Sequence, residues 1–201
     1  MQAGRLHHKQ RASNLSFTAP LQPKLNPMPE TSSPLVGILM GSDSDWPKIQ
    51  AAAAALEAFG VAYEAHVMSA HRTPDLVRQY ATTALERGLK VILAAAGGAA
   101  HLAGVVASHT TLPVVGIPVP TELMGGLDSL LSIVQMPGDV PVAAVGAGMG
   151  GPRNAGLLAV QILALGDEKL QGRLAAFKRE LAAKVAAKDA AFQGKLRGAK
   201  M

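Results

Sequence analysis

The sequence predicts an α/β protein with a doubly wound parallel sheet, in which helices cover both faces and give three α/β/α layers. Two observations support this prediction. From Leu35 onward, five short apolar runs alternate with segments of helical period, and strands that alternate with helices in this way form parallel sheets. The 201 residues are 49% hydrophobic but only 3% aromatic, so we expect one core built from Ala, Val, Leu and Ile side chains.

The turn residues between these segments place the ends of the elements. Pro47 and Pro74 suit the first turns of two helices, and Gly60 and Gly88 are suited to end them. The predicted strands cover residues 35–40, 61–68, 91–96, 113–119 and 140–147. The predicted helices run from a cap among residues 43–45 to about residue 59, and over residues 73–87, 102–108, 127–135 and 152–165. Residues 35–166 are therefore expected to form one domain.

Basic residues are concentrated at the two ends of the chain. Residues 1–34 carry four Lys and Arg against one Glu, and residues 167–201 carry nine Lys and Arg against four acidic residues. Residues 35–166 instead carry six basic and nine acidic residues. The net charge of +5 therefore does not indicate a basic groove across the core. Because there are also few aromatic side chains to stack on bases, we expect no nucleic-acid partner.

The first 34 residues contain five prolines and no apolar periodicity, which predicts a disordered basic leader. This leader is either an organellar targeting segment or an extension from an upstream start codon, with Met28 as the alternative initiator. The sequence contains no apolar run long enough for a secretory signal or a bilayer span, so we expect no membrane association. Cysteine is absent, which excludes disulfides and thiolate chemistry and fits a cytoplasmic protein.

Residues 167–201 are predicted to form an extra C-terminal helix and a tail. Between residues 167 and 191, apolar side chains recur at helical spacing and form one stripe: Leu170, Leu174, Phe177, Leu181 and Val185. Such a stripe packs either on the edge of the chain's own sheet or on a neighbouring subunit. The abundance of Ala and Gly allows close packing and favours an oligomer, so we expect this segment at a subunit interface.

Polar residues that can do chemistry follow three of the predicted strands. His71 and Arg72 follow the second strand, the segment GSDSD at 41–45 follows the first, and GGAAH at 97–101 follows the third. Because ligands bind at the carboxyl ends of parallel strands, we expect the three segments to meet in one site. An imidazole titrates near neutral pH and suits proton transfer. A His-Arg pair in a loop is also commonly a solvated or helix-capping pair, and that interpretation stands beside the catalytic one.

The segment 41–45 lies on a predicted strand-to-helix turn, where free backbone N–H groups and hydroxyls can hold phosphate oxygens and a carboxylate can accept ribose hydroxyls. It lacks the Lys-Ser/Thr of a Walker loop, so ATP hydrolysis is not predicted. The glycine pattern at 146–151 resembles a dinucleotide fingerprint, but no further βαβ unit follows it. No pair of histidines has the spacing of metal ligands, so no metal site is predicted.

Four motifs occur in a fixed order: MGSDSDW at 40–46, SAHRTPD at 69–75, AGGAAHL at 96–102 and GLDSLLSIVQMP at 126–137. In these motifs the chain resembles the class I 5-(carboxyamino)imidazole ribonucleotide mutases, the family of the phosphoribosylaminoimidazole carboxylase catalytic subunit. The resemblance runs from about residue 36 to 165. It implies a flavodoxin-like fold and a homo-octamer in which each active site is built from more than one subunit.

The resemblance also implies a reaction in purine biosynthesis, with no metal, ATP or organic cofactor. In it, the carboxylate on the exocyclic amine of 5-(carboxyamino)imidazole ribonucleotide moves to carbon 4 of the ring. By motif position, His71 is the general acid/base, and Ser42, Asp45 and Arg72 bind the ribose phosphate end. An imidazolium can protonate the carbamate nitrogen and release carbon dioxide, and the neutral ring can then collect the proton from carbon 4. Five further residues are placed around the substrate in a closed pocket: Ser69, Gly97, Gly98, Ala99 and His101.

Several alternatives stay open. Class II relatives carboxylate aminoimidazole ribonucleotide directly with carbon dioxide, but they typically carry Lys-Gly in place of Arg72-Thr73, and a non-catalytic nucleotide-binding protein can share the same fold. His101 stands at the start of a predicted helix and is either a site residue or a helix cap. The family usually has Gly and Pro where this chain has Ala95 and Ala103. Ala95 would disturb the pocket if its backbone needed a positive φ.

Overall fold

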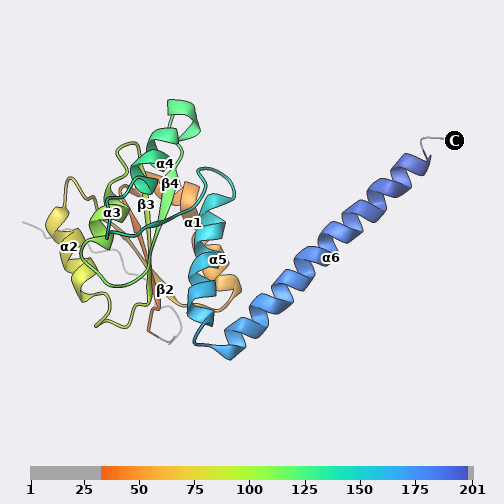
Figure 1. Cartoon of the computed structure of the whole chain (residues 1–201), viewed down its shortest axis with the longest axis horizontal. Coiled ribbons are helices and arrows are strands. Elements are labelled where there is room, and N and C mark those ends of the chain that lie inside the picture. Colours follow the sequence, from red (N-terminus) through yellow and green to blue (C-terminus); the bar gives the residue numbers. More distant parts are fainter. Residues whose placement is uncertain (1–32, 199–201) are drawn as a thin grey trace, which may run out of the picture. The chain divides into compact units, whose positions relative to one another are not determined.

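In the computed structural model, which describes residues 33–198, a five-stranded sheet lies between two layers of helices (Figure 1). The strands are β1 (Val36–Met40), β2 (Tyr63–Val67), β3 (Val91–Gly97), β4 (Val114–Val119) and β5 (Ala143–Ala144). All neighbours are parallel, and their order is β2-β1-β3-β4-β5. This is the flavodoxin-like order, in which the chain changes direction between β1 and β3 and opens a crevice there. The predicted doubly wound, three-layer sheet is confirmed.

Helices cover both faces of the sheet and enclose two apolar clusters. They are α1 (Trp46–Ala58) and α5 (Gly151–Ala164) on one face, and α2 (Pro74–Thr83), α3 (Leu102–Ala107) and α4 (Leu127–Val134) on the other. A Cβ atom at Gly156 of α5 would collide with the Ala52 carbonyl oxygen of α1. The absence of a side chain therefore lets these two helices pack with their backbones in close approach.

The strands at the centre of the sheet are the ones that the apolar runs predict best. Every residue of β1 and β4 is buried, as are the first six residues of β3, because helices lie on both faces of a parallel sheet. A Cβ atom at Gly37 of β1 would collide with the Tyr80 hydroxyl of α2. Gly37 thus lets an aromatic side chain lie against the middle of the sheet.

Several elements differ in length from the prediction, and β2 is three residues shorter than the predicted strand over residues 61–68. The strand expected over residues 140–147 is only two residues long, because it is a largely exposed edge and Pro141 has no N–H to donate to a ladder. The helix expected over residues 73–87 ends at Thr83 and continues as turns to Gly88. Before α1, residues Asp43–Asp45 form a 3-10 turn. The predicted leader, apart from its last two residues, lies outside the described residues.

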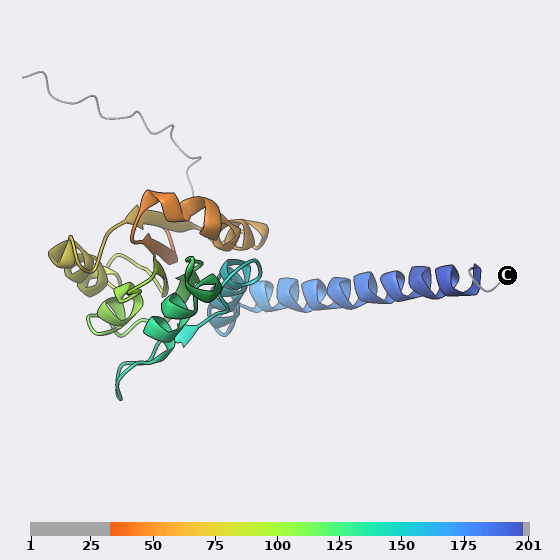
Figure 2. The ribbon, with the colours of Figure 1, turned by 90° about the horizontal axis from the view of Figure 1, so that it is seen from above.

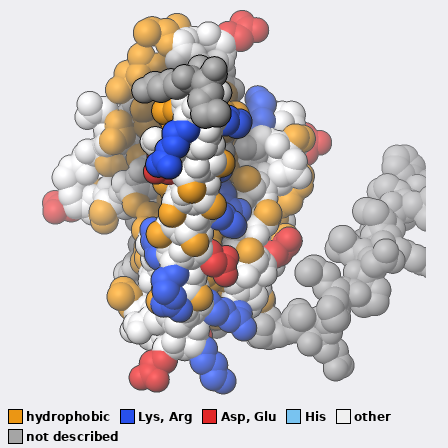
Figure 3. Space-filling view, turned by 90° about the vertical axis from the view of Figure 1, so that its right-hand side faces the viewer, with side chains coloured by type: hydrophobic (Ala, Val, Ile, Leu, Met, Phe, Trp, Pro, Cys, Tyr) orange, Lys and Arg blue, Asp and Glu red, His pale blue; other side chains and the backbone are white. Residues whose placement is uncertain are grey.

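Helix α6 (Glu168–Gly198) is longer than predicted and packs on the domain through its first turns. The Phe177 ring meets the Phe59 ring edge-on, with 5.5 Å between ring centres, and Arg173 donates to the Phe59 carbonyl oxygen at 2.8 Å. Residues 178–198 are all exposed, and the apolar stripe continues there through Leu181, Val185, Phe192 and Leu196. Figure 2 shows the ribbon of this helix, and Figure 3 shows Lys and Arg side chains among the hydrophobic ones. Among the described helices, none is both long and apolar enough to cross a membrane.

Candidate active site

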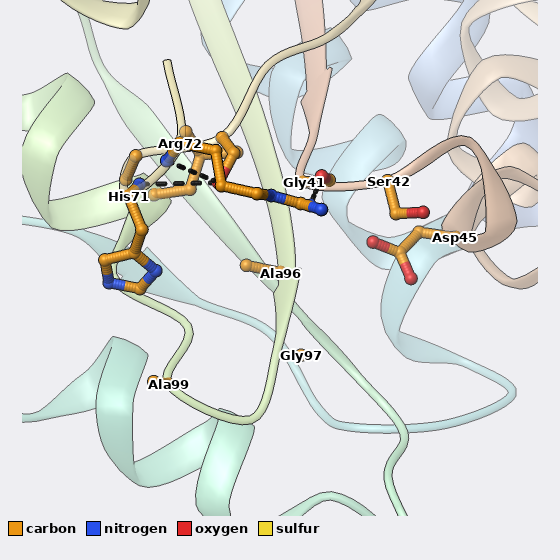
Figure 4. Close-up of a pocket in the computed structure, with 11 residues that line it drawn as sticks. Gly41, Ser42, Asp45, His71, Arg72, Ala96, Gly97 and Ala99 are labelled. Atoms are coloured by element: carbon orange, nitrogen blue, oxygen red, sulfur yellow. Dashed lines mark hydrogen bonds between the residues drawn. The ribbon is translucent and has the colours of Figure 1, made fainter. Parts of the chain in front are cut away.

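The loops that follow β1, β2 and β3 surround a cavity of about 420 Å³ at the carboxyl end of the sheet (Figure 4). This volume suits a small-molecule ligand. The lining residues are Gly41, Ser42, Asp45, Ser69, Ala70, His71, Arg72, Ala96, Gly97, Ala99 and Leu102. Seven of the nine predicted site residues are therefore brought together. The other two, Gly98 and His101, lie in the loop after β3 but outside the cavity lining.

The loop after β1 presents a hydroxyl and a carboxylate to the cavity. The Ser42 hydroxyl caps the 3-10 turn by accepting the Ser44 N–H at 3.3 Å. Burial raises the pKa of the Asp45 carboxyl, although Lys48 and a backbone hydrogen bond at Ser42 oppose this shift. A carboxylate whose charged form is disfavoured in the folded protein is typical of a binding or catalytic position.

The loop after β2 is held by hydrogen bonds around one hydroxyl. The Ser69 oxygen accepts the backbone N–H of His71 at 3.3 Å and of Arg72 at 3.2 Å, which leaves its own O–H free to donate into the cavity. Thr73 closes the same turn, because its hydroxyl accepts the Ser69 N–H at 2.9 Å and donates to the Ser69 carbonyl at 3.1 Å. Ser69 thus fixes the backbone that carries both predicted functional side chains.

The Arg72 guanidinium reaches across to the end of β1. It donates to the Gly41 carbonyl oxygen at 2.8 Å (Figure 4). Within residues 33–198 it forms no ion pair, whereas Asp75 lies 3.9 Å from Arg78 on the same helix. Asp75 thus does not pair with Arg72, and the remaining N–H donors of this cation face the cavity without an acidic partner.

His71 and His101 are joined side chain to side chain. The Nε2 atom of His71 lies 2.8 Å from the Nδ1 atom of His101, with the rings edge-on at 4.9 Å between centres. One of the two facing nitrogens must donate and the other must accept, so the position of the hydrogen on one ring determines its position on the other. His101 occupies the N-cap position of α3, but its side chain makes no capping hydrogen bond and instead contacts His71. A role of His101 in the site stays a prediction.

The sequence profile of the AIR carboxylase family matches residues 35–184. The chain belongs to this family. It is 57% identical over 165 residues to the N5-carboxyaminoimidazole ribonucleotide mutase of Mycobacterium tuberculosis H37Rv, which covers 82% of this chain and 94% of the relative. The mutase of Bacillus subtilis 168 is 59% identical over 141 residues, 70% of this chain and 87% of that protein. The crystal structure of Treponema denticola PurE superposes with a TM-score of 0.71 at 30% identity, over 78% of this chain and 97% of that one.

The two departures from the usual AIR carboxylase pattern do not disturb the cavity. Ala95 lies within β3 opposite Met40, is fully buried, and belongs to the apolar cluster under α1 and α5. Its φ is not positive, so the methyl group causes no strain. Ala103 is fully buried on α3 and lies beside Gly116 of β4. Neither residue lines the cavity.

Sequence reasoning missed the part that α4 plays in this AIR carboxylase site. Ser129 is fully buried and contacts the loop after β3, as does Ser132 one turn further on. Next to them, Asp128 accepts the Thr121 hydroxyl at 2.6 Å and the Ser129 N–H at 2.8 Å. The Thr121 hydrogen bond is the main reason why the pKa of Asp128 lies below its ordinary value. Both serines lie in the motif GLDSLLS at 126–132, and this motif is the sequence feature that could have indicated them.

Proposed function

We propose that this chain is a mutase that converts 5-(carboxyamino)imidazole ribonucleotide to 4-carboxy-5-aminoimidazole ribonucleotide in purine biosynthesis. The observation that carries the proposal is the position of His71. Its imidazole lines the cavity between a loop of hydroxyl and carboxylate groups and a loop of small residues. The curated relatives in the same family carry the name of this activity.

In the proposed reaction, His71 moves one proton in each direction. The imidazolium donates a proton to the carbamate nitrogen, the N–C bond breaks, and carbon dioxide is released beside the ring. Carbon 4 then attacks this carbon dioxide, and the neutral imidazole removes the proton from carbon 4. The proton count returns to its starting value, so the overall reaction is an isomerisation. No external acid, base or cofactor is needed for the balance.

The substrate's ribose phosphate end fits the side of the cavity that carries Ser42, Asp45 and Arg72. The Arg72 guanidinium has further N–H donors available for phosphate oxygens, since the Gly41 carbonyl accepts only one of them. The Asp45 carboxylate suits ribose hydroxyls. The Ser69 O–H, which is free to donate, suits a carboxylate oxygen of the substrate. This orientation places the imidazole ring of the nucleotide beside His71 and Ala99.

The carbon dioxide formed in this mechanism must be kept from solvent, and we infer that a second copy of the chain helps to enclose it. Within one chain, His71, Arg72, Gly97 and Ala99 are all exposed. Sites that hold reactive intermediates exclude water and keep their reactants together. The expected homo-octamer would supply the missing wall. The unpartnered stripe on residues 181–196 of α6 supports packing between subunits.

The test is an activity assay with two substrates, together with a measurement of ribonucleotide binding. Purified protein given 5-(carboxyamino)imidazole ribonucleotide should form the 4-carboxy product without ATP or added bicarbonate. Protein given aminoimidazole ribonucleotide with saturating carbon dioxide should react much more slowly. A reversal of these two rates would indicate direct carboxylation of the class II kind. Tight binding of either ribonucleotide without turnover would indicate a non-catalytic nucleotide-binding protein.

A further inference from the structure

Ser129 is the buried polar side chain that the structure gives among residues 33–198, with no exposed surface at all. It lies on the first turn of α4, outside the cavity lining. A buried hydroxyl is retained at low cost only when both its donor and its acceptor capacity are used. Its contacts therefore show which backbone groups depend on it.

The Ser129 hydroxyl joins β3 and β4 at the point where they separate. Gly97 and Val119 are the last residues paired in the register of these strands. Immediately beyond them, the Ser129 oxygen accepts the Gly98 N–H at 2.9 Å and its O–H donates to the Val119 carbonyl at 2.7 Å. The hydroxyl thus satisfies a donor and an acceptor that would otherwise be left unpaired where the ladder ends.

Ser132 holds the other side of the same residue. Its hydroxyl lies 3.1 Å from the Gly98 carbonyl oxygen and 2.8 Å from the Asp128 carbonyl oxygen, and its single hydrogen serves either one. The Gly98 N–H therefore bonds one serine, and its C=O lies within hydrogen-bond distance of the other. Its φ of +67° is a conformation that favours glycine, and the two serines lie where they can maintain it.

The fixed glycine determines where the next residues lie. The Gly98 carbonyl accepts the Ala100 N–H at 2.8 Å, and the Ala99 carbonyl accepts the His101 N–H at 2.9 Å. This tight turn carries the His101 ring to within 2.8 Å of His71. A contiguous set of hydrogen bonds and tight turns thus connects α4 with the imidazole that we assign to proton transfer.

We propose that Ser129 and Ser132 are positioning residues for the reaction: by clamping both backbone groups of Gly98, they hold His101 against His71. This inference rests on the proposed function for its kinetic part and on the geometry alone for its structural part. The residues assigned to the phosphate end lie on the loops after β1 and β2, which the clamp does not touch. Loss of the clamp should therefore slow the chemical step more than it weakens binding.

The test compares Ser129→Ala and Ser132→Ala with the control Ser108→Ala, whose hydroxyl bonds only the Val105 carbonyl at the end of α3. Ser129→Ala should lower kcat by about 10- to 100-fold, as small displacements of a reacting group do, and leave KM within about threefold. Ser132→Ala should have a smaller effect of the same kind, and Ser108→Ala should have none.

Two readouts need no turnover: hydrogen exchange of the peptide that contains Gly98, and the NMR chemical shifts of the two imidazole rings. The clamp predicts faster exchange at the Gly98 amide in Ser129→Ala, and changed ring chemical shifts because the contact between His71 and His101 is lost. Wild-type kcat with protected exchange at Gly98 would overturn the proposal. If Ser129→Ala does not fold, Ser132→Ala decides the matter by the same criteria. If the wild-type protein shows no mutase turnover, the proposed function fails, and hydrogen exchange and chemical shifts alone then judge the clamp.

Discussion

Two clusters of charged side chains lie near the edge strand β2, and they differ in how their charged groups are satisfied. In the first, on β2 and beside α2, Glu64 accepts the Tyr80 hydroxyl at 2.7 Å and an Arg87 N–H at 2.5 Å, and Arg87 also lies 4.4 Å from the centre of the Tyr80 ring. In the second, the cavity, Arg72 bonds a main-chain carbonyl and Asp45 bears a charge that burial disfavours. The charged groups of the first cluster hydrogen-bond one another, whereas those of the second have hydrogen-bonding capacity left for a ligand.

The pKa values record the same difference. Burial acts to raise the pKa of Glu64, but the hydrogen bonds from Arg87 and Tyr80 outweigh it, and the pKa lies below its ordinary value. Burial likewise raises the pKa of Asp45, and there the opposing groups do not compensate. Substitutions in the cavity should therefore affect activity more than stability, and substitutions in the Glu64 cluster should do the reverse.

The largest expected effect is that of His71→Asn, which keeps a polar side chain and removes the titrating group. We expect turnover to fall by roughly 10²–10⁴-fold with the nucleotide still bound, because general acid/base catalysis contributes about that much. Steady-state kinetics and ligand titration measure both quantities. His109→Asn, which alters a histidine outside the four motifs, is the matched control. A variant that kept more than a few per cent of the wild-type rate would contradict the role of His71.

Arg72→Ala should come next and should act mainly on affinity. A hydrogen bond to a charged group contributes about 1.5–3 kcal/mol, which corresponds to a loss of about 10- to 100-fold in affinity for the ribonucleotide. The control Arg78→Ala removes a cation from the following helix whose acidic neighbour is exposed. Unchanged affinity in Arg72→Ala, measured by calorimetric titration, would remove this residue from the site and weaken the assignment of Ser42 and Asp45.

Asp45→Asn should weaken nucleotide binding without lowering the stability of the fold. Because the pKa of Asp45 is raised in the folded protein, its ionised form is disfavoured there, so its contribution to stability is lost as pH rises through that pKa. The variant should melt at the same or a higher temperature than wild type at pH 7, and it should bind the nucleotide more weakly. Asp43→Asn, on the same turn but exposed, should change neither property. A marked drop in melting temperature would show that Asp45 stabilises the fold.

Glu64→Gln should produce the smallest effect, and it should appear in stability alone. A lowered pKa in the folded state gives a contribution that is present above the unfolded value, about 4.3, and is lost as pH falls through the folded value. Urea unfolding at pH 7 should show a loss of about 1 kcal/mol, a modest value because Arg87 is 37% exposed and partly screened by solvent. The difference from wild type should shrink below about pH 4. Glu86→Gln, an exposed neighbour, serves as the control.

The sequence predicts the centre of the fold better than its edges. Strands β1, β3 and β4 lie within one residue of prediction, because burial on both faces leaves an unbroken apolar run. Strand β5 was predicted too long, since apolar residues at a sheet edge look the same in sequence as those at its centre. Helix α6 is longer than predicted because it continues through Gly194, and a single glycine inside a helical pattern does not have to end the helix. The octamer, the disordered leader and the cytoplasmic location stay predictions.

Site residues that a local sequence pattern places can be predicted from the sequence, whereas contacts between residues far apart in the chain cannot. Residues such as Ser42 and Arg72 stand beside strand ends, so a local pattern finds them. The contacts of Ser129 join residues 31 and 10 positions away, and the motif GLDSLLS around Ser129 does not indicate which residues these are. The contact between His71 and His101 spans 30 positions and likewise required the fold. Pairings of this kind depend on the order of strands in the sheet, which local periodicity does not reveal.

The single tryptophan of this chain has a consequence for how ligand binding can be observed. Trp46 begins α1 directly after Asp45, and its half-buried ring packs against the core below the cavity. Because the chain has no other indole, its fluorescence emission should report on this one turn. We expect emission to shift when the cavity fills and to be unchanged in Arg72→Ala at the same ligand concentration. The protein thus contains one intrinsic fluorescent probe directly after a residue that lines the candidate active site.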